Sequence, residues 1–98
     1  MFIVAEKTGS HGLLLVVTDA DILGQKFEQE NLLLDLTQKF YQGVSKTKEE
    51  VKELFFKARH LHLTGKQIVA VAIEMDLVEP ERILWVKGVP HAQVVMGE

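Results

Sequence analysis

The sequence predicts an α+β fold: a small mixed β-sheet of about five strands, with two longer helices and one short helix on one side. Three observations predict it. Strand-like apolar runs stand near both ends of the chain, and segments with helical spacing stand between them. The expected order, β-β-α-β-α-α-β-β, lacks the regular alternation of strand and helix that a parallel sheet requires. A chain of 98 residues is expected to form a single compact domain over residues 1–98.

The composition excludes several kinds of chemistry. The chain contains no cysteine, so disulfides, thiolate zinc sites and a cysteine nucleophile are excluded. The apolar run in Met1–Glu6 is too short for a signal peptide, and Leu13–Val17 is far too short to span a bilayer. We therefore expect a cytoplasmic protein with no membrane partner.

The first third of the chain predicts a hairpin followed by a short helix. Met1–Glu6 and Leu13–Thr18 are β-rich and are separated by a loop that contains two glycines. Thr18 or Asp19 can cap the free N–H groups of a short helix, and Gly24 can end it in the left-handed conformation. A cation site at the Asp19-x-Asp21 pair is the alternative, and capping is favoured over it.

The next segments lead to the clearest element of the chain. Asn31–Leu36 predicts a third strand, and Phe40–Gly43 marks an aromatic turn. Thr47 and Glu50 have the form of a capping box, in which each side chain bonds the other residue's backbone N–H. A stripe at helical spacing follows and predicts a helix that continues to Leu63. Its apolar members are Val51, Leu54, Phe55, Ala58 and Leu61.

The last third predicts a helix and two strands. Lys66–Met75 is ambiguous, because its β-branched residues suit a strand while Thr64 and the polar residues after Ile73 favour a buried helix. The helix is the preferred interpretation. Pro80 then breaks the chain. Ile83–Lys87 and Ala92–Met96 predict the final strands, which are joined through Gly88-Val89-Pro90-His91.

The histidines do not predict a metal site. On the predicted helix, His60 and His62 point about 200° apart, so the helix cannot direct both at one ion. Structural roles are therefore favoured, and neither a metal nor another cofactor is expected. His91 lies at a predicted turn and is a candidate general base, but no serine, carboxylate or metal partner can be placed beside it.

The basic middle of the chain is the most informative surface. Residues 46–66 hold six basic and three acidic side chains, although the whole chain has a net charge of −3. On the predicted helix, Lys48, Lys52 and Arg59 fall within about 40° of one another, with Phe56 close beside them. Such a row suits phosphate contact and base stacking. The alternative is that these long side chains only border the core.

Several stretches together resemble a known family. Asp21–Phe27, Phe40–Gly43, Gly65–Glu74 and Gly88–Gln93 occur here in one order. This pattern is similar to the archaeal family catalogued as "domain of unknown function 424", over nearly the whole chain. The resemblance implies an archaeal source, a small α+β fold and no assigned catalytic activity. It supplies no catalytic residues, and Asp76 stands where a helix-ending glycine is common in that family.

The resemblance also draws attention to five motif residues, which are Gly24, Gly88, Pro90, His91 and Gln93. The glycines and the proline have structural roles that explain them. His91 and Gln93 would point to the same face of a strand. An imidazole beside an amide could read a base edge or a carboxylate, and hydrogen bonding to a neighbouring loop is the favoured alternative.

Three functions remain open at this stage, and they are ranked in this order. The first is a non-catalytic binding module that contacts RNA, or a ribosomal particle in translation, through Lys48, Lys52, Phe56 and Arg59. The second is a protein-interaction or homo-oligomerising domain that uses the apolar end of the chain. The third is a small enzyme built around His91, and the sequence leans against catalysis.

Overall fold

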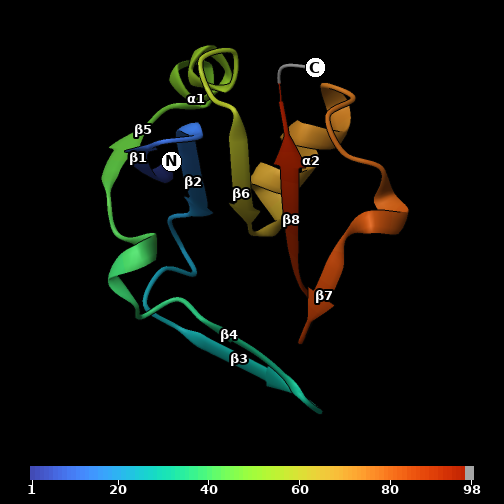
Figure 1. Ribbon diagram of the computed structural model, residues 1–98. Helices are drawn as coiled ribbons and strands as arrows, with labels where there is room; N and C mark the ends of the chain where they lie inside the picture. The colour runs from blue at the N-terminus through green and yellow to red at the C-terminus, as the bar shows by residue number, and fades with distance from the viewer. Residues whose placement is uncertain (97–98) are drawn as a thin grey trace.

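The computed structural model of the protein describes residues 1–96, and over these residues the chain has an α+β fold (Figure 1). The helices are α1 (Lys48–Phe55) and α2 (Lys66–Glu74), with short 3₁₀ turns η1 (Lys39–Tyr41) and η2 (Pro80–Arg82). The strands are β1 (Phe2–Gly9), β2 (Gly12–Asp19), β3 (Lys26–Gln29), β4 (Leu32–Asp35), β5 (Val44–Lys46), β6 (His60–Thr64), β7 (Leu84–Val86) and β8 (Val89–Val95). Within residues 1–96, neither helix has the length and apolar character needed to cross a membrane.

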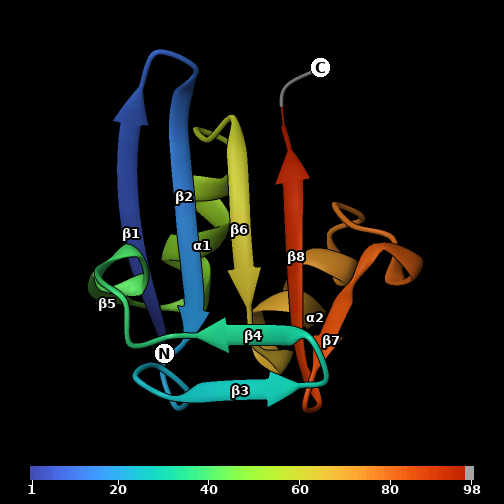
Figure 2. The same cartoon turned by 60° about the horizontal axis from the view of Figure 1, so that its bottom comes forward.

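Six of the strands form one mixed sheet in the order β5-β1-β2-β6-β8-β7. Strands β2 and β6 at its centre are parallel, and the other neighbours are antiparallel. Helices α1 and α2 cover one face of this sheet, whereas the β3–β4 hairpin crosses the lower end of the other face (Figure 2). The mixed sheet and the helices on one side are as predicted, although the sheet has six strands instead of about five.

The alternation of side chains along each strand gives the sheet two different faces. The main core lies on the helix side and includes Leu15, Val17, Leu61 and Leu63, all of them completely buried. We call the other side the open face. The strand registers place on it Ile3, Ala5 and Lys7 of β1, Leu14, Val16 and Thr18 of β2, Ser45 of β5, His60, His62 and Thr64 of β6, Leu84 and Val86 of β7, and Val89, His91, Gln93 and Val95 of β8.

A second, smaller core lies under the β3–β4 hairpin. Leu34 and Leu36 pack there against Val86 and Val89 of the open face. The backbone N–H of Lys87 donates a 2.7 Å hydrogen bond to the side-chain oxygen of Gln29, which fastens the end of the hairpin to the β7–β8 turn. The hairpin therefore covers one end of the open face, and the η1 segment packs over β1 and β2 beside it, where Ala5 and Val16 are buried.

Several local predictions are confirmed. The capping box at Thr47 is present: the N–H of Glu50 donates to the Thr47 hydroxyl, and the N–H of Thr47 donates to the Glu50 carboxylate. The ambiguous segment after Gly65 is a helix, α2, with Ile68, Val69, Val71 and Ala72 buried. The predicted hairpin of the first two strands is present as β1 and β2.

The prediction of one helix from Thr47 to Leu63 is wrong. Helix α1 ends at Phe55, and residues 60–64 form β6. The sequence His60-Leu61-His62-Leu63-Thr64 alternates with the period of a strand, and its two leucines enter the core. Pairing with β2 and β8 satisfies the backbone on both sides of this segment, which outweighs the helical spacing of Ala58 and Leu61.

The predicted short helix after Thr18 is also wrong, because residues 20–24 form turns that lead into β3. Asp19 does cap a helix, but the helix is α2. The carboxylate of Asp19 accepts hydrogen bonds from the N–H groups of Gln67 (2.8 Å) and Ile68 (2.9 Å). The N-cap residue Gly65 has no side chain, and a Cβ there would collide with the carboxyl group of Asp19. Burial raises the pKa of Asp19, and the two N–H donors oppose that rise.

Replacing Asp19 by alanine should lower the free energy of unfolding by about 1–3 kcal/mol, because two N–H groups at a buried helix end lose their acceptor. Urea unfolding followed by the fluorescence of Trp85, the sole tryptophan, measures the effect. Asp21→Ala is the matched control, since Asp21 is exposed. Equal unfolding midpoints for the two variants would contradict the assignment of Asp19 as the cap of α2.

Replacing Asp76 by glycine should raise the free energy of unfolding by up to about 1 kcal/mol. Asp76 has a φ of 63° just after α2, where the N–H of Leu77 bonds the carbonyl of Ala72 at 2.9 Å to close the helix. This left-handed position strains any residue with a Cβ. The same urea experiment tests the prediction, and a loss of stability would show that the aspartate side chain stabilises the turn.

Candidate functional site: a histidine row on the open face

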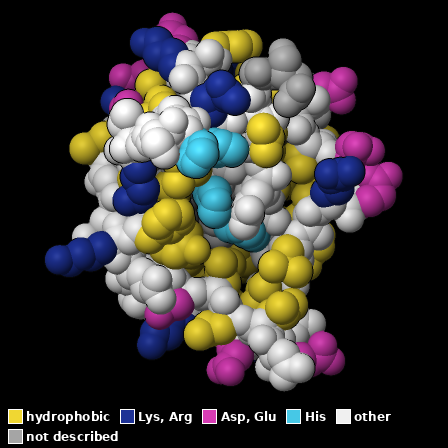
Figure 3. Space-filling view, viewed as in Figure 1, with side chains coloured by type: hydrophobic (Ala, Val, Ile, Leu, Met, Phe, Trp, Pro, Cys, Tyr) yellow, Lys and Arg dark blue, Asp and Glu magenta, His cyan; other side chains and the backbone are white. Residues whose placement is uncertain are grey.

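Three histidines gather at the centre of the open face. His60 and His62 lie on β6, and His91 lies on the neighbouring strand β8; we call these three the histidine row. Because His60 and His62 are two residues apart on a strand, they point to the same face, and the predicted separation of about 200° on a helix is wrong. Figure 3 shows the histidines as one continuous group, with the visible acidic side chains toward the rim of the view.

The His62 ring makes contact with two other rings, those of His91 and Phe40. The ring centroids of His62 and His91 are 5.8 Å apart, and those of His62 and Phe40 are 5.5 Å apart, both with edge-to-face geometry. The Nζ of Lys7, on β1, lies 5.1 Å from the centroid of the Phe40 ring. A connected series of rings therefore runs from β8 toward β1 and ends at a cation.

The position of Phe40 depends on a close approach of two backbone segments. Phe40 lies in η1, and the chain then passes β1 at Gly43, where a Cβ would collide with the carbonyl of Val4.

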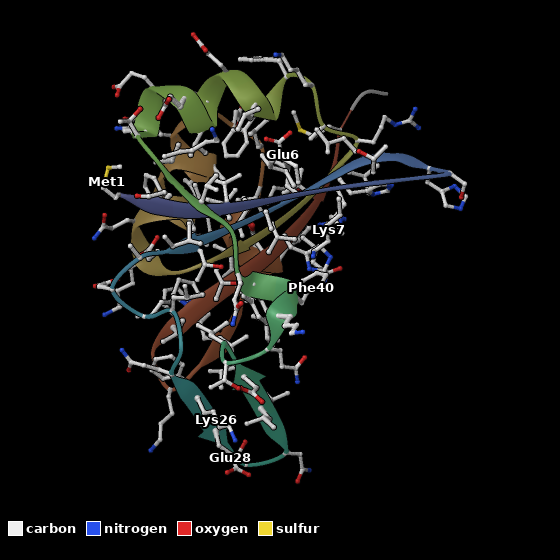
Figure 4. All side chains as sticks on the ribbon, turned by 90° about the vertical axis from the view of Figure 1, so that its left-hand side faces the viewer. Met1, Glu6, Lys7, Lys26, Glu28 and Phe40 are labelled. Carbon is white, nitrogen blue, oxygen red and sulfur yellow. The ribbon has the colours of Figure 1, made fainter. Side chains whose placement is uncertain are left out.

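In Figure 4, Lys7 and Phe40 lie on the same side of β1, while Glu6 points toward α1. Alternation along β1 thus separates the cation on the open face from its acidic neighbour.

Hydrogen bonding and burial act on the ring protonation of His62 and His91. The Nδ1 of His91 is hydrogen-bonded at 2.8 Å to the hydroxyl of Thr64, which is completely buried. The pKa values of His62 and His91 are lowered because burial disfavours the charged ring, and a neighbouring histidine adds a smaller effect to each. These two rings are therefore mainly uncharged at neutral pH and offer hydrogen bonds and flat surfaces.

The open face is free of negative charge. None of the outward positions of the sheet that the register assigns within residues 1–96 is aspartate or glutamate. Two shallow hollows flank His62 on this face. One has a volume of about 570 Å³ and is lined by Lys7, His11, Leu14 and His60, among others. The second, of about 400 Å³, is lined by Arg82, Leu84, His91 and Gln93.

The side chains of the histidine row do not converge as metal ligands do. Among residues 1–96, the structure has no group of three or more histidine, aspartate or glutamate side chains with the geometry to hold a metal ion. Candidate chemistry on the open face is therefore built from rings, amides and cations.

The structure disperses the predicted basic stripe. Lys48 is at the start of α1 and forms a 3.8 Å ion pair with Glu74 of α2. Arg59 lies beyond the helix, where its side chain packs over Gly12 in the β1–β2 turn and its N–H donates to the carbonyl of Leu13. Lys52 and Phe56 remain together at the end of α1, and Phe56 is 76% exposed. The prediction that all four side chains lie along one helix is wrong.

The five motif residues do not form one site. Gly24 and Gly88 both have positive φ angles, in the turn before β3 and in the β7–β8 turn. Pro90 is buried in β8, and its carbonyl accepts the N–H of Gly65 at 2.9 Å. Only His91 and Gln93 reach the open face, and their shared orientation on a strand is as predicted. His91 bonds Thr64 of the adjacent strand instead of a loop.

Sequence reasoning missed most of this surface. It identified His91 and Gln93, but not the contributions of Lys7, Phe40 and Arg82. The period-two histidines of residues 60–64 are a signal that could have placed His60 and His62 on one face. No signal in the sequence could have brought Phe40 over β6, because that contact joins segments that are distant along the chain.

Comparisons with known proteins agree with the fold and assign no activity. A family model described as "Protein of unknown function (DUF424)" matches residues 6–96. The crystal structure of an uncharacterized conserved protein from Methanopyrus kandleri is similar with a TM-score of 0.77 and 19% sequence identity, and the match covers 99% of this chain and 94% of that one. No curated protein matches the chain.

The lowered pKa values of His62 and His91 predict how stability depends on pH. Below the ordinary value of 6.5, the unfolded chain takes up protons that the folded chain binds less readily. The contribution of these rings to stability is therefore complete above about 6.5 and declines as the pH falls toward their native pKa values. Urea unfolding between pH 7.5 and 5, roughly the range in which histidine titrates, measures this decline.

The double variant His62→Gln, His91→Gln should show a smaller decline than the wild type, since the titrating rings are gone. His11→Gln, which removes an exposed ring in the β1–β2 turn, is the control. Parallel pH profiles for the wild type and the double variant would contradict the assignment.

Proposed function

We propose that this chain, which belongs to the DUF424 family of proteins of unknown function, is a non-catalytic binding module that holds single-stranded RNA on the open face of its sheet. The proposal keeps RNA as the ligand class predicted from the sequence and moves the interface from the helix to the sheet. We also propose that the protein is archaeal and cytoplasmic, and that its RNA belongs to a ribosomal particle or the translation machinery.

The observation that carries the proposal is the series of contacting rings on a face without carboxylates. Unpaired bases bind proteins mainly by stacking on aromatic side chains, and a sheet whose helices lie behind it presents such rings to a strand of RNA. Phe40, His62 and His91 supply the rings, and the lowered pKa values keep the two histidines mainly neutral. Neutral rings stack without the cost of removing water from a charge.

The distribution of charge supports this orientation. Lys7 and Arg82 border the two hollows of the open face, where they can contact phosphates on either side of the rings. The acidic side chains of α1 lie on the helix side, together with Glu6 of β1. The acids on the open side, Glu28, Glu30 and Asp35, belong to the β3–β4 hairpin at one end of the face, away from the rings of His62 and His91.

Two observations favour other interfaces. Phe56 is 76% exposed beside Lys52, so the end of α1 is a second candidate for RNA contact. Among residues 1–96, β7 pairs only with Val89–His91, and no strand pairs with the outer edge of β8 after His91, where a protein partner or a second copy of the chain could add one. An enzyme built around His91 has less support, because the hydrogen-bond partner of its ring is a threonine and not a carboxylate.

RNA affinity should depend on the open face. With a fluorescently labelled single-stranded oligonucleotide of mixed sequence, His62→Ala and Phe40→Ala should each weaken binding about tenfold, the order expected for loss of one stacked base. Fluorescence anisotropy over a series of salt concentrations measures the affinity, which should fall steeply with salt.

The matched control is the pair Lys52→Glu, Phe56→Ser, which changes charge and aromatic area on the helix side. A loss of affinity in this control alone would place the interface at the end of α1 and overturn the proposal. Absence of RNA binding by the wild type would overturn it as well. Circular dichroism of every variant checks that the fold is retained.

A further inference from the structure

We propose that the hollow beside His91 is an anion subsite for a phosphate or carboxylate group, held by Arg82, the Nε2–H of His91 and the amide of Gln93. Thr64 acts in this subsite as a positioning residue that selects the tautomer of His91. The inference deepens the proposed RNA function, on which its biological role rests, by naming where one phosphate of the ligand is held.

The hydrogen bond between Thr64 and His91 fixes which ring nitrogen carries the proton. Thr64 is completely buried, so its hydroxyl hydrogen needs an acceptor inside the protein. Within residues 1–96, the partner of this hydroxyl is the Nδ1 of His91, at 2.8 Å. If Nδ1 carried the proton, the buried hydroxyl hydrogen would be left without an acceptor. Thr64 therefore donates, Nδ1 accepts, and the proton of the neutral ring is on Nε2.

The tautomer matters because His91 lines the hollow. The Nδ1 edge of the ring is held against Thr64 on β6, so Nε2 is the ring nitrogen left to bind a ligand. A neutral imidazole with hydrogen on Nε2 is a hydrogen-bond donor at that atom. The subsite thus gains a donor that needs no protonation, in accord with the lowered pKa of His91.

Arg82 supplies the positive charge. The turn η2 holds Arg82 beside the hollow. The N–H of Arg82 donates to the carbonyl of Glu79, and the N–H of Ile83 donates to the carbonyl of Pro80. Arg82 also borders a groove that contains Asp76 and Glu79. In the part of the chain that the structure describes, however, no carboxylate lies within ion-pair distance of its guanidinium. Its donors are available to a ligand.

The lining of the hollow suits an anion better than a cation or a neutral group. Its polar members are two groups that only donate, Arg82 and His91, and one amide that can donate or accept, Gln93. None of its lining residues is acidic. A planar guanidinium with convergent N–H groups recognises carboxylate and phosphate oxygens. The volume of about 400 Å³ admits a phosphate together with the sugar that carries it.

NMR spectroscopy of the full chain tests the inference without RNA. The ring nitrogens of His91 should show hydrogen on Nε2 in the free protein. Inorganic phosphate should then shift the resonances of His91 and Gln93, and adenosine 5′-monophosphate should shift the same resonances. Arg82→Gln should weaken both titrations about tenfold, the order expected for loss of a charge-assisted hydrogen bond. Lys48→Gln, on the helix side, is the control.

The role of Thr64 is tested separately. Thr64→Val should reduce the fraction of His91 with hydrogen on Nε2 and weaken the phosphate titration, whereas Thr64→Ser, which keeps the hydroxyl, should restore both. An unchanged tautomer in Thr64→Val would overturn the positioning role. This readout does not depend on any effect of the valine on stability.

The ligand series distinguishes a free anion from a nucleotide and the subsite from the proposed function. Equal affinity for phosphate and the nucleotide supports an anion subsite that ignores the base, and tighter nucleotide binding supports one phosphate of an RNA chain. Shifts with adenosine 5′-monophosphate but not with inorganic phosphate would overturn the subsite in favour of base recognition. Absence of phosphate-induced shifts would overturn it even if RNA binds the protein. Phosphate binding without RNA binding would instead overturn the proposed function and leave the subsite standing.

Discussion

The carboxylate of Asp19 joins the sheet to helix α2 and caps the start of that helix. It stands at the end of β2 and accepts the first free N–H groups of α2, a helix that begins directly after β6. Because β2 and β6 are parallel neighbours, their C-terminal ends lie side by side. Asp19 at the end of β2 is therefore close to the start of α2, which follows β6. The absence of a Cβ at Gly65 is required for it. The buried side chains of α2 pack into the main core on the same side of the sheet, so the cap and the core together leave the other face open.

That arrangement separates the chemistry of the two sides. The helix side contains the main core and carries the acidic side chains of α1, with Lys48 paired to Glu74. The open side carries neutral rings with a cation near each end. Strand alternation alone produces this separation along β1, where consecutive residues Glu6 and Lys7 point to opposite faces. A short chain with a net negative charge can therefore still present a surface suited to an anionic ligand.

The sequence predicted correctly those features that depend on residues close together in the chain. The capping box of Thr47 and Glu50 involves residues three apart, and both of its hydrogen bonds are present. His60 and His62 were misplaced because Ala58 and Leu61 continue the spacing of α1. The segment is a strand because it pairs with Leu14–Thr18 of β2, and each paired residue lies 46 positions earlier in the chain. Asp19 was recognised as a cap, but its helix lies 48 residues away, beyond the reach of any local pattern. Phe40 and Arg82 were missed for the same reason.

The β3–β4 hairpin has a consequence for the size of any ligand. Its apolar side chains are fixed onto Val86 and Val89, and Gln29 is bonded to the β7–β8 turn. The hairpin thereby closes one end of the open face. A long polymer on this face cannot run along the strands past the hairpin, so it has to cross the strands and leave over an edge of the sheet. The footprint on such a polymer would be only a few units long.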